Sequence, residues 1–262
     1  MRPRNKKHLE ERFEKCSNLV IADPAALKGK WRSVFVSEDD KVMPLHLEIG
    51  CGKGVSTVQL SHENPDINLV AIDEVRHVLA VTIKNASEAY GEAPVSNLKL
   101  CSLDAMYISD TFSAEDKVDR VIINFCNPWD ERLKHHKRRL THPRQLVQYR
   151  SFLKDDGEIH FKTDNVELFE ASMEYFAACG FEIAYRTDDL RASGYTPNYV
   201  SEHERMYSLR GIPIHFAIAR MGALPEGFDY TYDGRRIDQN ERGQQHRGRP
   251  PKVCGDGEGT QD

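Results

Sequence analysis

Short apolar runs alternate with stretches of helical periodicity along most of the chain. An apolar run that ends in Gly, Asp or Asn is typical of a buried strand, whereas apolar residues three or four positions apart are typical of a helix. The pattern predicts strands at residues 45–49, 67–72, 98–103, 118–125, 157–161, 181–185 and 212–219. It predicts helices at residues 5–18, 55–62, 75–90 and 166–178.

Strands that alternate with helices predict an α/β fold, with a central, mostly parallel, seven-stranded sheet and helices on both faces. The final strands lie closer together in the chain and are able to pair antiparallel. We divide the chain into a basic helical extension at 1–40, the α/β domain at 41–221 and a tail at 222–262. The tail holds 8 of the 17 glycines and few apolar residues, so we expect it to be disordered, above all from residue 235.

Composition and net charge limit the kind of protein. Apolar residues make up 39% and charged residues 29% of the chain, and the formal net charge is −5, as expected for a globular protein. No apolar run approaches the ~20 residues that a membrane span needs, and none follows the basic N-terminus, so we expect neither a membrane partner nor a secretory signal. The six cysteines are scattered without a Cys-x-x-Cys pair, so we expect reduced thiols and a cytoplasmic location.

Basic residues concentrate at 1–15 and 132–150, although the total charge is negative. The segment 132–144 holds six Lys or Arg and three His, and such a segment can neutralise the phosphates of RNA. The solvated start of a basic helix is the alternative. We expect no metal at His135, His136 and His142, because no Cys or carboxylate has a suitable spacing to them.

A glycine loop separates the first predicted strand from the helix that follows it. It reads Glu48-Ile-Gly-Cys-Gly-Lys-Gly54, and Gly50 and Gly52 allow a tight turn and a close approach of the backbone to a ligand. The spacing differs from the Gly-x-Gly-x-x-Gly of dinucleotide sites, and no Gly-Lys-Ser/Thr indicates a nucleoside triphosphate. A tight strand-to-helix turn without a ligand is the alternative.

Three acidic residues lie near the ends of successive predicted strands. Asp73 comes 23 residues after Gly50, where doubly wound folds place the carboxylate that binds ribose hydroxyls. Glu48 lies at the mouth of the glycine loop and is suited to an ammonium group, and Asp104 lies near the expected position of an adenine. Open parallel sheets bind ligands at the carboxyl ends of their strands, so these acids predict a ligand site.

Three further segments carry polar residues in defined patterns. Asn124-Phe-Cys-Asn-Pro-Trp129 ends the most apolar predicted strand, just before the basic run. Phe161-Lys-Thr-Asp-Asn165 ends the fifth predicted strand, and Ser201-Glu-His-Glu204 precedes the last one. The final Asn of the second segment is suited to cap a helix, and the third segment has the spacing of a capping box.

Together with the glycine loop, these segments resemble the motifs of bacterial tRNA (guanine-N7)-methyltransferases, in family order and over residues 40–221. The resemblance implies a Rossmann-like class I methyltransferase domain at 41–221, with S-adenosylmethionine as cofactor and tRNA as partner. It implies 7-methylguanosine in the tRNA variable loop, at guanosine 46, as the product. We expect a monomer or a homodimer.

The resemblance also assigns roles to residues of this chain. The implied cofactor residues are Glu48, Gly50, Gly52, Asp73, Asp104 and Asn127. The implied substrate residues are Asp164, Ser201, Glu202, His203 and Glu204, with Arg132 in the place of a family lysine. Asn127 and Asp164 are the implied catalytic residues.

The chain departs from the family pattern beside the Pro-Trp pair. Asn127 stands where the family has Asp, and Asp130-Glu131 stands where it has Pro-Lys, so Arg132 or Lys134 would replace the lysine. An amide still accepts a hydrogen bond. The alternatives are a degenerate paralogue that binds tRNA or cofactor without turnover, and a methyltransferase for a small molecule, which the basic run at 132–144 disfavours.

The expected chemistry needs no general base, because guanine N7 carries an in-plane lone pair and no proton. The rate then depends on the alignment of N7, the methyl group and sulfur. We expect the Asp164 and Glu204 carboxylates to accept hydrogen bonds from guanine N1–H and N2–H, a donor pair that adenine lacks. Trp129 either stacks on the target base or serves as a packing anchor.

Overall fold

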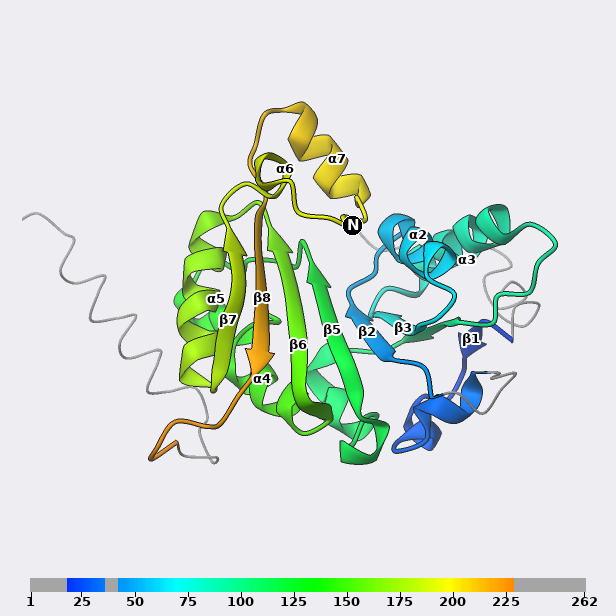
Figure 1. Ribbon diagram of the computed structural model, residues 1–262, viewed down its shortest axis with the longest axis horizontal. Coiled ribbons are helices and arrows are strands. Elements are labelled where there is room, and N and C mark those ends of the chain that lie inside the picture. Colours follow the sequence, from blue (N-terminus) through cyan, green and yellow to red (C-terminus); the bar gives the residue numbers. More distant parts are fainter. Residues whose placement is uncertain (1–17, 36–41, 229–262) are drawn as a thin grey trace, which may run out of the picture.

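The computed structural model describes residues 18–35 and 42–228 of the chain (Figure 1). The basic helix predicted at 5–18 therefore lies almost entirely outside the described residues. The predicted tail is described only at 222–228. Among the described residues, no helix has both the length and the apolar character that crossing a membrane requires.

Two flanking segments contact the α/β domain. Within residues 18–35, Trp31 is fully buried and donates its indole N–H to the Thr111 carbonyl at 3.0 Å. After the last strand, the Gly222 N–H donates to the Gly180 carbonyl at 2.9 Å. Both segments are therefore hydrogen-bonded to the domain.

Within the described residues, an eight-stranded sheet has the spatial order β1-β4-β3-β2-β5-β6-β8-β7 (Figure 1). The strands are β1 Val20–Ile21, β2 Leu45–Ile49, β3 Asn68–Asp73, β4 Leu98–Ser102, β5 Val118–Asn124, β6 Leu153–Thr163, β7 Phe181–Thr187 and β8 His215–Met221. Neighbours from β1 to β6 pair in parallel, whereas β8 is antiparallel to both β6 and β7. The predicted mostly parallel sheet is confirmed. The predicted number of strands, seven, omitted β1. A strand of two residues is too short to be recognised as an apolar run.

The α-helices of the described part are α2 Val55–Glu63, α3 Arg76–Tyr90, α4 Pro143–Arg150, α5 Val166–Ala178, α6 Leu190–Ser193 and α7 Glu202–Leu209. The helices predicted at 55–62, 75–90 and 166–178 are confirmed as α2, α3 and α5. The sequence pattern does not reveal α4, because polar residues dominate it and its buried face combines Leu146 and Tyr149 with Gln145.

Helices cover both faces of the sheet. Leu47 of β2 shares one core with Leu146 of α4 and Phe169 of α5, and Figure 1 shows these two helices behind the sheet. Ala71 of β3 and Leu79 of α3 belong to a separate core on the opposite face. All five residues of β2 are buried, although its sequence alternates apolar and polar residues, with Leu45, Leu47 and Ile49 in the first of these cores.

His142 begins α4 and is wholly buried. Its Nδ1 accepts a hydrogen bond from the Arg144 N–H at 3.2 Å, and its ring lies edge-on to Tyr175 with 5.4 Å between centroids. Nδ1 is therefore unprotonated in the folded protein. Burial and, after it, the charge of Arg139 lower the pKa of His142 to about 4.

We expect acid to destabilise the protein through His142. Between pH 6.5 and about 4, the unfolded chain binds a proton at His142 that the folded chain excludes. The free energy of unfolding therefore decreases as the pH is lowered through this range. Above this range the imidazole is neutral in both states. Urea unfolding measures the free energy of unfolding near pH 7.5 and near pH 5. Between these two pH values, the wild type should lose about 2 kcal/mol more than His142→Asn, a variant that retains a helix cap. Equal losses would show that His142 does not change its protonation on unfolding.

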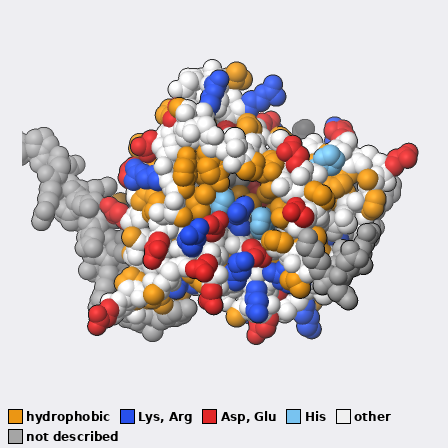
Figure 2. All heavy atoms as spheres, in the orientation of Figure 1, with side chains coloured by type: hydrophobic (Ala, Val, Ile, Leu, Met, Phe, Trp, Pro, Cys, Tyr) orange, Lys and Arg blue, Asp and Glu red, His pale blue; other side chains and the backbone are white. Residues whose placement is uncertain are grey.

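On the face that points away from α4 and α5, β5 and β6 carry several charged residues. Arg120 pairs with Glu158 at 3.4 Å, and Arg220 of β8 reaches the same carboxylate at 3.0 Å. Figure 2 shows charged side chains of both signs over this face of the molecule. The row continues along β6 to Lys162, whose neighbour in register is Asn124. Charged and polar side chains thus extend to the carboxyl edge of the sheet.

Candidate active site

The glycine loop turns the chain from β2 into α2 at this edge. Gly50, Gly52 and Gly54 have positive φ angles of 81°, 56° and 69°, which residues with a Cβ rarely adopt. The N–H groups of Gly50 and Cys51 both donate to the Ile72 carbonyl, at 2.8 and 3.1 Å. The loop is thereby held against the end of β3. At Gly50 and Gly52, no atom of the described residues, apart from the glycine and its chain neighbours, lies within 4 Å of the place where a Cβ would be, so the backbone is open to a ligand.

Replacing Gly54 by alanine is expected to destabilise the loop more than replacing Gly52. Both positions have positive φ, but a Cβ at Gly54 would lie 2.2 Å from Thr82 Cγ2, whereas the space at Gly52 is open. We expect the free energy of unfolding to decrease by about 1 kcal/mol in Gly52→Ala and by about 3 kcal/mol in Gly54→Ala. Urea unfolding without added cofactor measures both. Equal losses would show that Thr82 moves aside without cost.

Asp73 ends β3 and binds the glycine loop. Its Oδ2 accepts a hydrogen bond from the Gly52 N–H at 2.9 Å, and its Oδ1 accepts one from the Val75 N–H at 2.8 Å. An ionised carboxylate has about four acceptor sites. Asp73 is therefore held in place by two backbone donors and keeps acceptor capacity for a ligand.

Asp104 and Asn127 follow β4 and β5 in a similar way. Asp104 Oδ1 accepts a hydrogen bond from the Met106 N–H at 2.9 Å, and Asn127 Oδ1 accepts one from the Trp129 N–H at 3.0 Å. Phe125 and Trp129 have positive φ angles of 53° and 51°, so the chain turns sharply on both sides of Asn127. Each short polar side chain closes a turn just beyond its strand.

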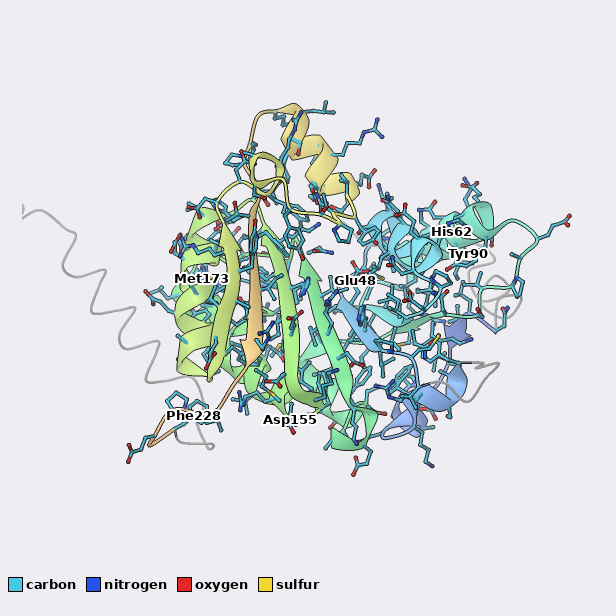
Figure 3. All side chains as sticks on the ribbon, in the orientation of Figure 1. Glu48, His62, Tyr90, Asp155, Met173 and Phe228 are labelled. Carbon is cyan, nitrogen blue, oxygen red and sulfur yellow. The ribbon has the colours of Figure 1, made fainter. Side chains whose placement is uncertain are left out.

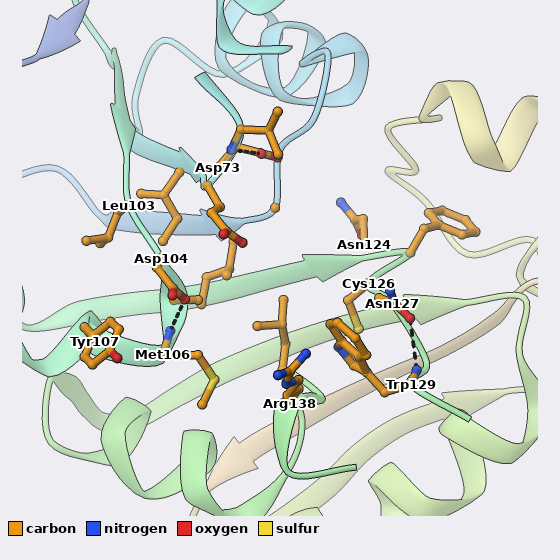
Figure 4. A pocket seen from close by; sticks show the side chains of 18 of the residues that line it. Asp73, Leu103, Asp104, Met106, Tyr107, Asn124, Cys126, Asn127, Trp129 and Arg138 are labelled. Atoms are coloured by element: carbon orange, nitrogen blue, oxygen red, sulfur yellow. Dashed lines mark hydrogen bonds between the residues drawn. The ribbon is translucent and has the colours of Figure 1, made fainter. Parts of the chain in front are cut away.

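A cavity of about 660 Å³ lies at the carboxyl ends of β2, β3, β4 and β5 (Figure 4). The structure brings together there four of the predicted cofactor residues, namely Gly50, Asp73, Asp104 and Asn127. Sequence reasoning missed other residues of its lining, among them Leu103, Met106, Tyr107 and Leu140. No local pattern separates such apolar residues from ordinary packing residues. The volume is typical of a small-molecule site.

Glu48 lies at the end of β2, with only 2% of its surface exposed (Figure 3). Its Oε1 accepts a hydrogen bond from Asn124 Nδ2 at 3.2 Å, and its Oε2 has no partner among the described residues. Burial raises the pKa of Glu48, while the nearby Thr57 and Asn124 side chains and the charge of Lys162 oppose the rise. Glu48 lines a second cavity of about 350 Å³, which shares Gly50 and Asn124 with the first.

Helix α7 borders this second cavity. Ser201 caps the helix, and Glu202 pairs with Lys53 of the glycine loop at 2.6 Å. His203 stacks on Phe125, with 6.0 Å between the ring centroids. Ser201, Glu202 and His203 line the cavity together with the loop, which includes Gly52. The fold therefore brings together two motifs that are far apart in the sequence.

Glu204 differs from these three neighbours. Only 4% of it is exposed, and it does not line either cavity. Its Oε2 accepts a hydrogen bond from Lys162 Nζ at 3.1 Å, and its Oε1 accepts one from Asn198 Nδ2 at 2.6 Å. Both oxygens are thus bound to donors of the protein itself.

Asp164 lies at the same edge of the sheet, directly after β6, and is half-buried. Its neighbour Asn165 caps α5 by accepting a hydrogen bond from the Leu168 N–H at 2.7 Å, which confirms the predicted cap. Arg132 is exposed and precedes the short helical turn Leu133–Arg138. Neither Asp164 nor Arg132 is part of the lining of the two cavities.

The basic run is divided between the core and the surface. Arg139 is buried, donates to the Pro128 carbonyl at 2.7 Å and pairs with Glu167 at 3.3 Å. Arg138 lies over the Trp129 ring, 5.0 Å from its centroid, at the first cavity. The exposed basic residues of the run are Arg132, Lys134, Lys137, Arg138 and Arg144. In the part of the chain that the structure describes, no group of three His, Cys, Asp or Glu is placed to hold a metal.

Comparison with known proteins adds to this geometry. A methyltransferase family model (Methyltransf_4) matches residues 42–216. The chain is 46% identical over 222 residues to the tRNA (guanine-N(7)-)-methyltransferase of Clostridium perfringens (strain SM101 / Type A), covering 84% of this chain and 99% of that protein. It is 48% identical over 221 residues to the protein of the same name from Clostridium beijerinckii, covering 84% and 98%. A solved variant of the 16S rRNA (adenine(1408)-N(1))-methyltransferase from Catenulisporales acidiphilia has a TM-score of 0.49 and 14% identity, covering 78% of this chain and 93% of that one.

Proposed function

Because the chain belongs to the tRNA (guanine-N7)-methyltransferase family, we propose that it transfers a methyl group from S-adenosylmethionine to N7 of a guanine in the tRNA variable loop, at guanosine 46. The observation that carries the proposal is the cavity that gathers Gly50, Asp73, Asp104 and Asn127 at the carboxyl edge of the sheet. The adjoining cavity beside α7 provides space for a second reactant.

The residues of the two cavities fit S-adenosylmethionine. This cofactor, when bound, supplies an electrophilic methyl group on a sulfonium. Asp73 retains acceptor sites for ribose hydroxyls, and Asp104 retains one oxygen for the adenine side. A buried carboxylate oxygen without a partner is costly, so Glu48 Oε2 is suited to the ammonium of the methionine part.

Asn127 takes the place of the family carboxylate. Its Oδ1 accepts the Trp129 N–H and, as an amide oxygen, has a second lone pair for a ligand. The amide thus closes the turn and still faces the first cavity, which supports turnover with Asn at this position.

The chain's part in the methyl transfer is alignment rather than proton removal, because guanine N7 has no proton to lose. We assign the second cavity to the target base, with the aromatic rings of His203 and Phe125 and the side chain of Ser201 in its lining. The base must leave its stack to enter, which costs a few kcal/mol. Holding both reactants in two fixed cavities reduces the entropy that the transition state would otherwise lose.

Recognition of guanine is assigned to Asp164. Its carboxylate lies at the same edge and is suited to accept hydrogen bonds from N1–H and N2–H. Its negative charge would also stabilise the cationic 7-methylguanine that forms. Glu204, by contrast, is already bound to Lys162 and Asn198, so we assign it a supporting role.

Binding of the tRNA backbone is assigned to the exposed basic residues of 132–144. Lys134, Lys137 and Arg144 are solvated, and Arg132 stands beside them in the place of the family lysine. Phosphate contacts of this kind make affinity fall steeply as salt rises.

A methyl-transfer assay with labelled S-adenosylmethionine and unmodified tRNA, followed by nucleoside analysis, tests the proposal. We expect 7-methylguanosine, and tRNA in which guanosine 46 is replaced by adenosine should accept no methyl group. Methylation at another nucleotide of the tRNA would show that guanosine 46 is not the target. Binding of both reactants without any product would favour the degenerate paralogue, and Asn127→Asp is then the variant in which turnover should return.

A further inference from the structure

Lys162 is a buried lysine near the carboxyl end of β6, with 11% of its side chain exposed. Its Nζ donates to Asn198 Oδ1 at 2.5 Å and to the Tyr199 carbonyl at 3.2 Å. It also forms an ion pair with Glu204 Oε2 at 3.1 Å. An ammonium has three donors, so these contacts use its full capacity. Two of the acceptors lie in the segment that leads into α7, and the third, Glu204, lies in its first turn.

The acceptors are also linked to one another. Asn198 Nδ2 donates to Glu204 Oε1 at 2.6 Å, which closes a ring of three side chains. Glu204 is as buried as Lys162, with 6% of its side chain exposed. Burial lowers the pKa of Lys162, whereas Glu204 and Glu48 raise it. The charge of Lys162 therefore acts on two carboxylates, Glu48 at the glycine loop and Glu204 in α7.

Two other contacts of the first turn of α7 with the domain are weaker. The side chains of the Lys53–Glu202 ion pair are 52% and 59% exposed, and exposed pairs contribute little. The His203 and Phe125 rings stack at 6.0 Å without a hydrogen bond to set their orientation. The buried ring around Lys162 is thus the contact that gives the start of α7 a defined position.

We propose that Lys162 is a positioning residue for tRNA methylation: through Glu204 and Asn198 it holds the start of α7 beside the glycine loop, without contacting tRNA itself. This inference rests on the proposed function, since it takes the cavity beside α7 as the place of the target base. A purely stabilising role explains the pair less well, because apolar side chains of similar size generally stabilise a protein as much as a buried ion pair does.

The test is the double variant Lys162→Met/Glu204→Met, which removes both charges of the buried ion pair together. We expect this variant to fold and to bind S-adenosylmethionine within about threefold of the wild-type Kd. We expect its kcat/KM for tRNA to fall by about a hundredfold, because a small displacement of α7 misplaces the base. Lys162→Arg, which keeps the charge, should retain kcat/KM within about tenfold.

Hydrogen exchange of the backbone amides in α7 gives a readout that does not depend on methylation. We expect faster exchange at Glu202–Leu209 in the double variant than in the wild type. Lys154→Met is the matched control, because Lys154 lies at the other end of the same strand and pairs with Asp119. It should leave both kcat/KM and exchange in α7 unchanged.

Wild-type kcat/KM in the double variant would overturn the proposal, and so would unchanged exchange in α7. An equal loss of cofactor affinity and of tRNA methylation would overturn it as well, since the effect would then not be confined to α7. Failure of the proposed function is distinguishable from these results. In that case the wild-type protein makes no 7-methylguanosine, yet exchange in α7 still rises in the double variant.

Discussion

Replacing Asp164 by alanine is expected to reduce kcat/KM for tRNA methylation by about a hundredfold to a thousandfold. The carboxylate lies at the end of β6 and accepts no hydrogen bond from the described residues, so it is available to guanine N1–H and N2–H. Without it, two donors of a desolvated base lack a partner, and the developing positive charge on the ring loses a nearby anion. The Kd for S-adenosylmethionine should change by less than about threefold, because the first cavity is intact.

Two further variants sharpen this test. Asp164→Asn keeps an acceptor but not the charge, so we expect an intermediate loss of about tenfold. Asp155→Ala removes an exposed carboxylate at the other end of β6 (Figure 3) and should behave as the wild type. Full activity of Asp164→Ala would exclude Asp164 from guanine recognition.

Replacing Asp73 by alanine is expected to weaken S-adenosylmethionine binding by about a hundredfold. The change removes the acceptor that we propose for the ribose hydroxyls. It also removes the acceptor of the Gly52 and Val75 N–H groups, so the glycine loop loses its contact with the end of β3. Calorimetric titration with the cofactor measures the effect, and tRNA affinity, measured by filter binding, should stay near the wild-type value.

Asp66→Ala is the matched control for Asp73. Asp66 is an exposed carboxylate just before β3, at the strand end remote from the cavity. We expect this variant to bind the cofactor with wild-type affinity. An unchanged cofactor Kd in Asp73→Ala would show that the first cavity does not bind the ribose.

Part of the lining of the first cavity could be predicted because these residues lie next to strand ends. Apolar runs locate the strands, and parallel pairing aligns their carboxyl ends, so Asp73, Asp104 and Asn127 meet without any knowledge of side-chain packing. Glu48 also belongs to this edge, but its placement in the second cavity depends on which face of β2 it occupies. Alternation in Leu45–Ile49 places Glu48 on the face opposite the three apolar residues, but it does not reveal that α7 and the glycine loop line a cavity there.

The roles of Glu204 and Arg139 could not be predicted from the sequence. The motif suggests that Glu204 is exposed to substrate, yet it pairs with Lys162, 42 residues away in the chain. Arg139 belongs to a run that reads as a solvated patch, yet it is buried because the Pro128 carbonyl and Glu167 satisfy it. Burial of a charged side chain depends on partners from other elements, and the local sequence does not show which partners the fold provides.

The position of β8 between β6 and β7 has a consequence for synthesis of the protein on the ribosome. β7 forms its sheet hydrogen bonds with β8 alone, and β8 is the last strand of the described chain. A nascent chain that has not yet released His215–Met221 therefore has an unpaired edge on β6 and no partner for β7. The parallel half of the sheet can assemble during translation, whereas β7 enters the sheet only after β8 has emerged.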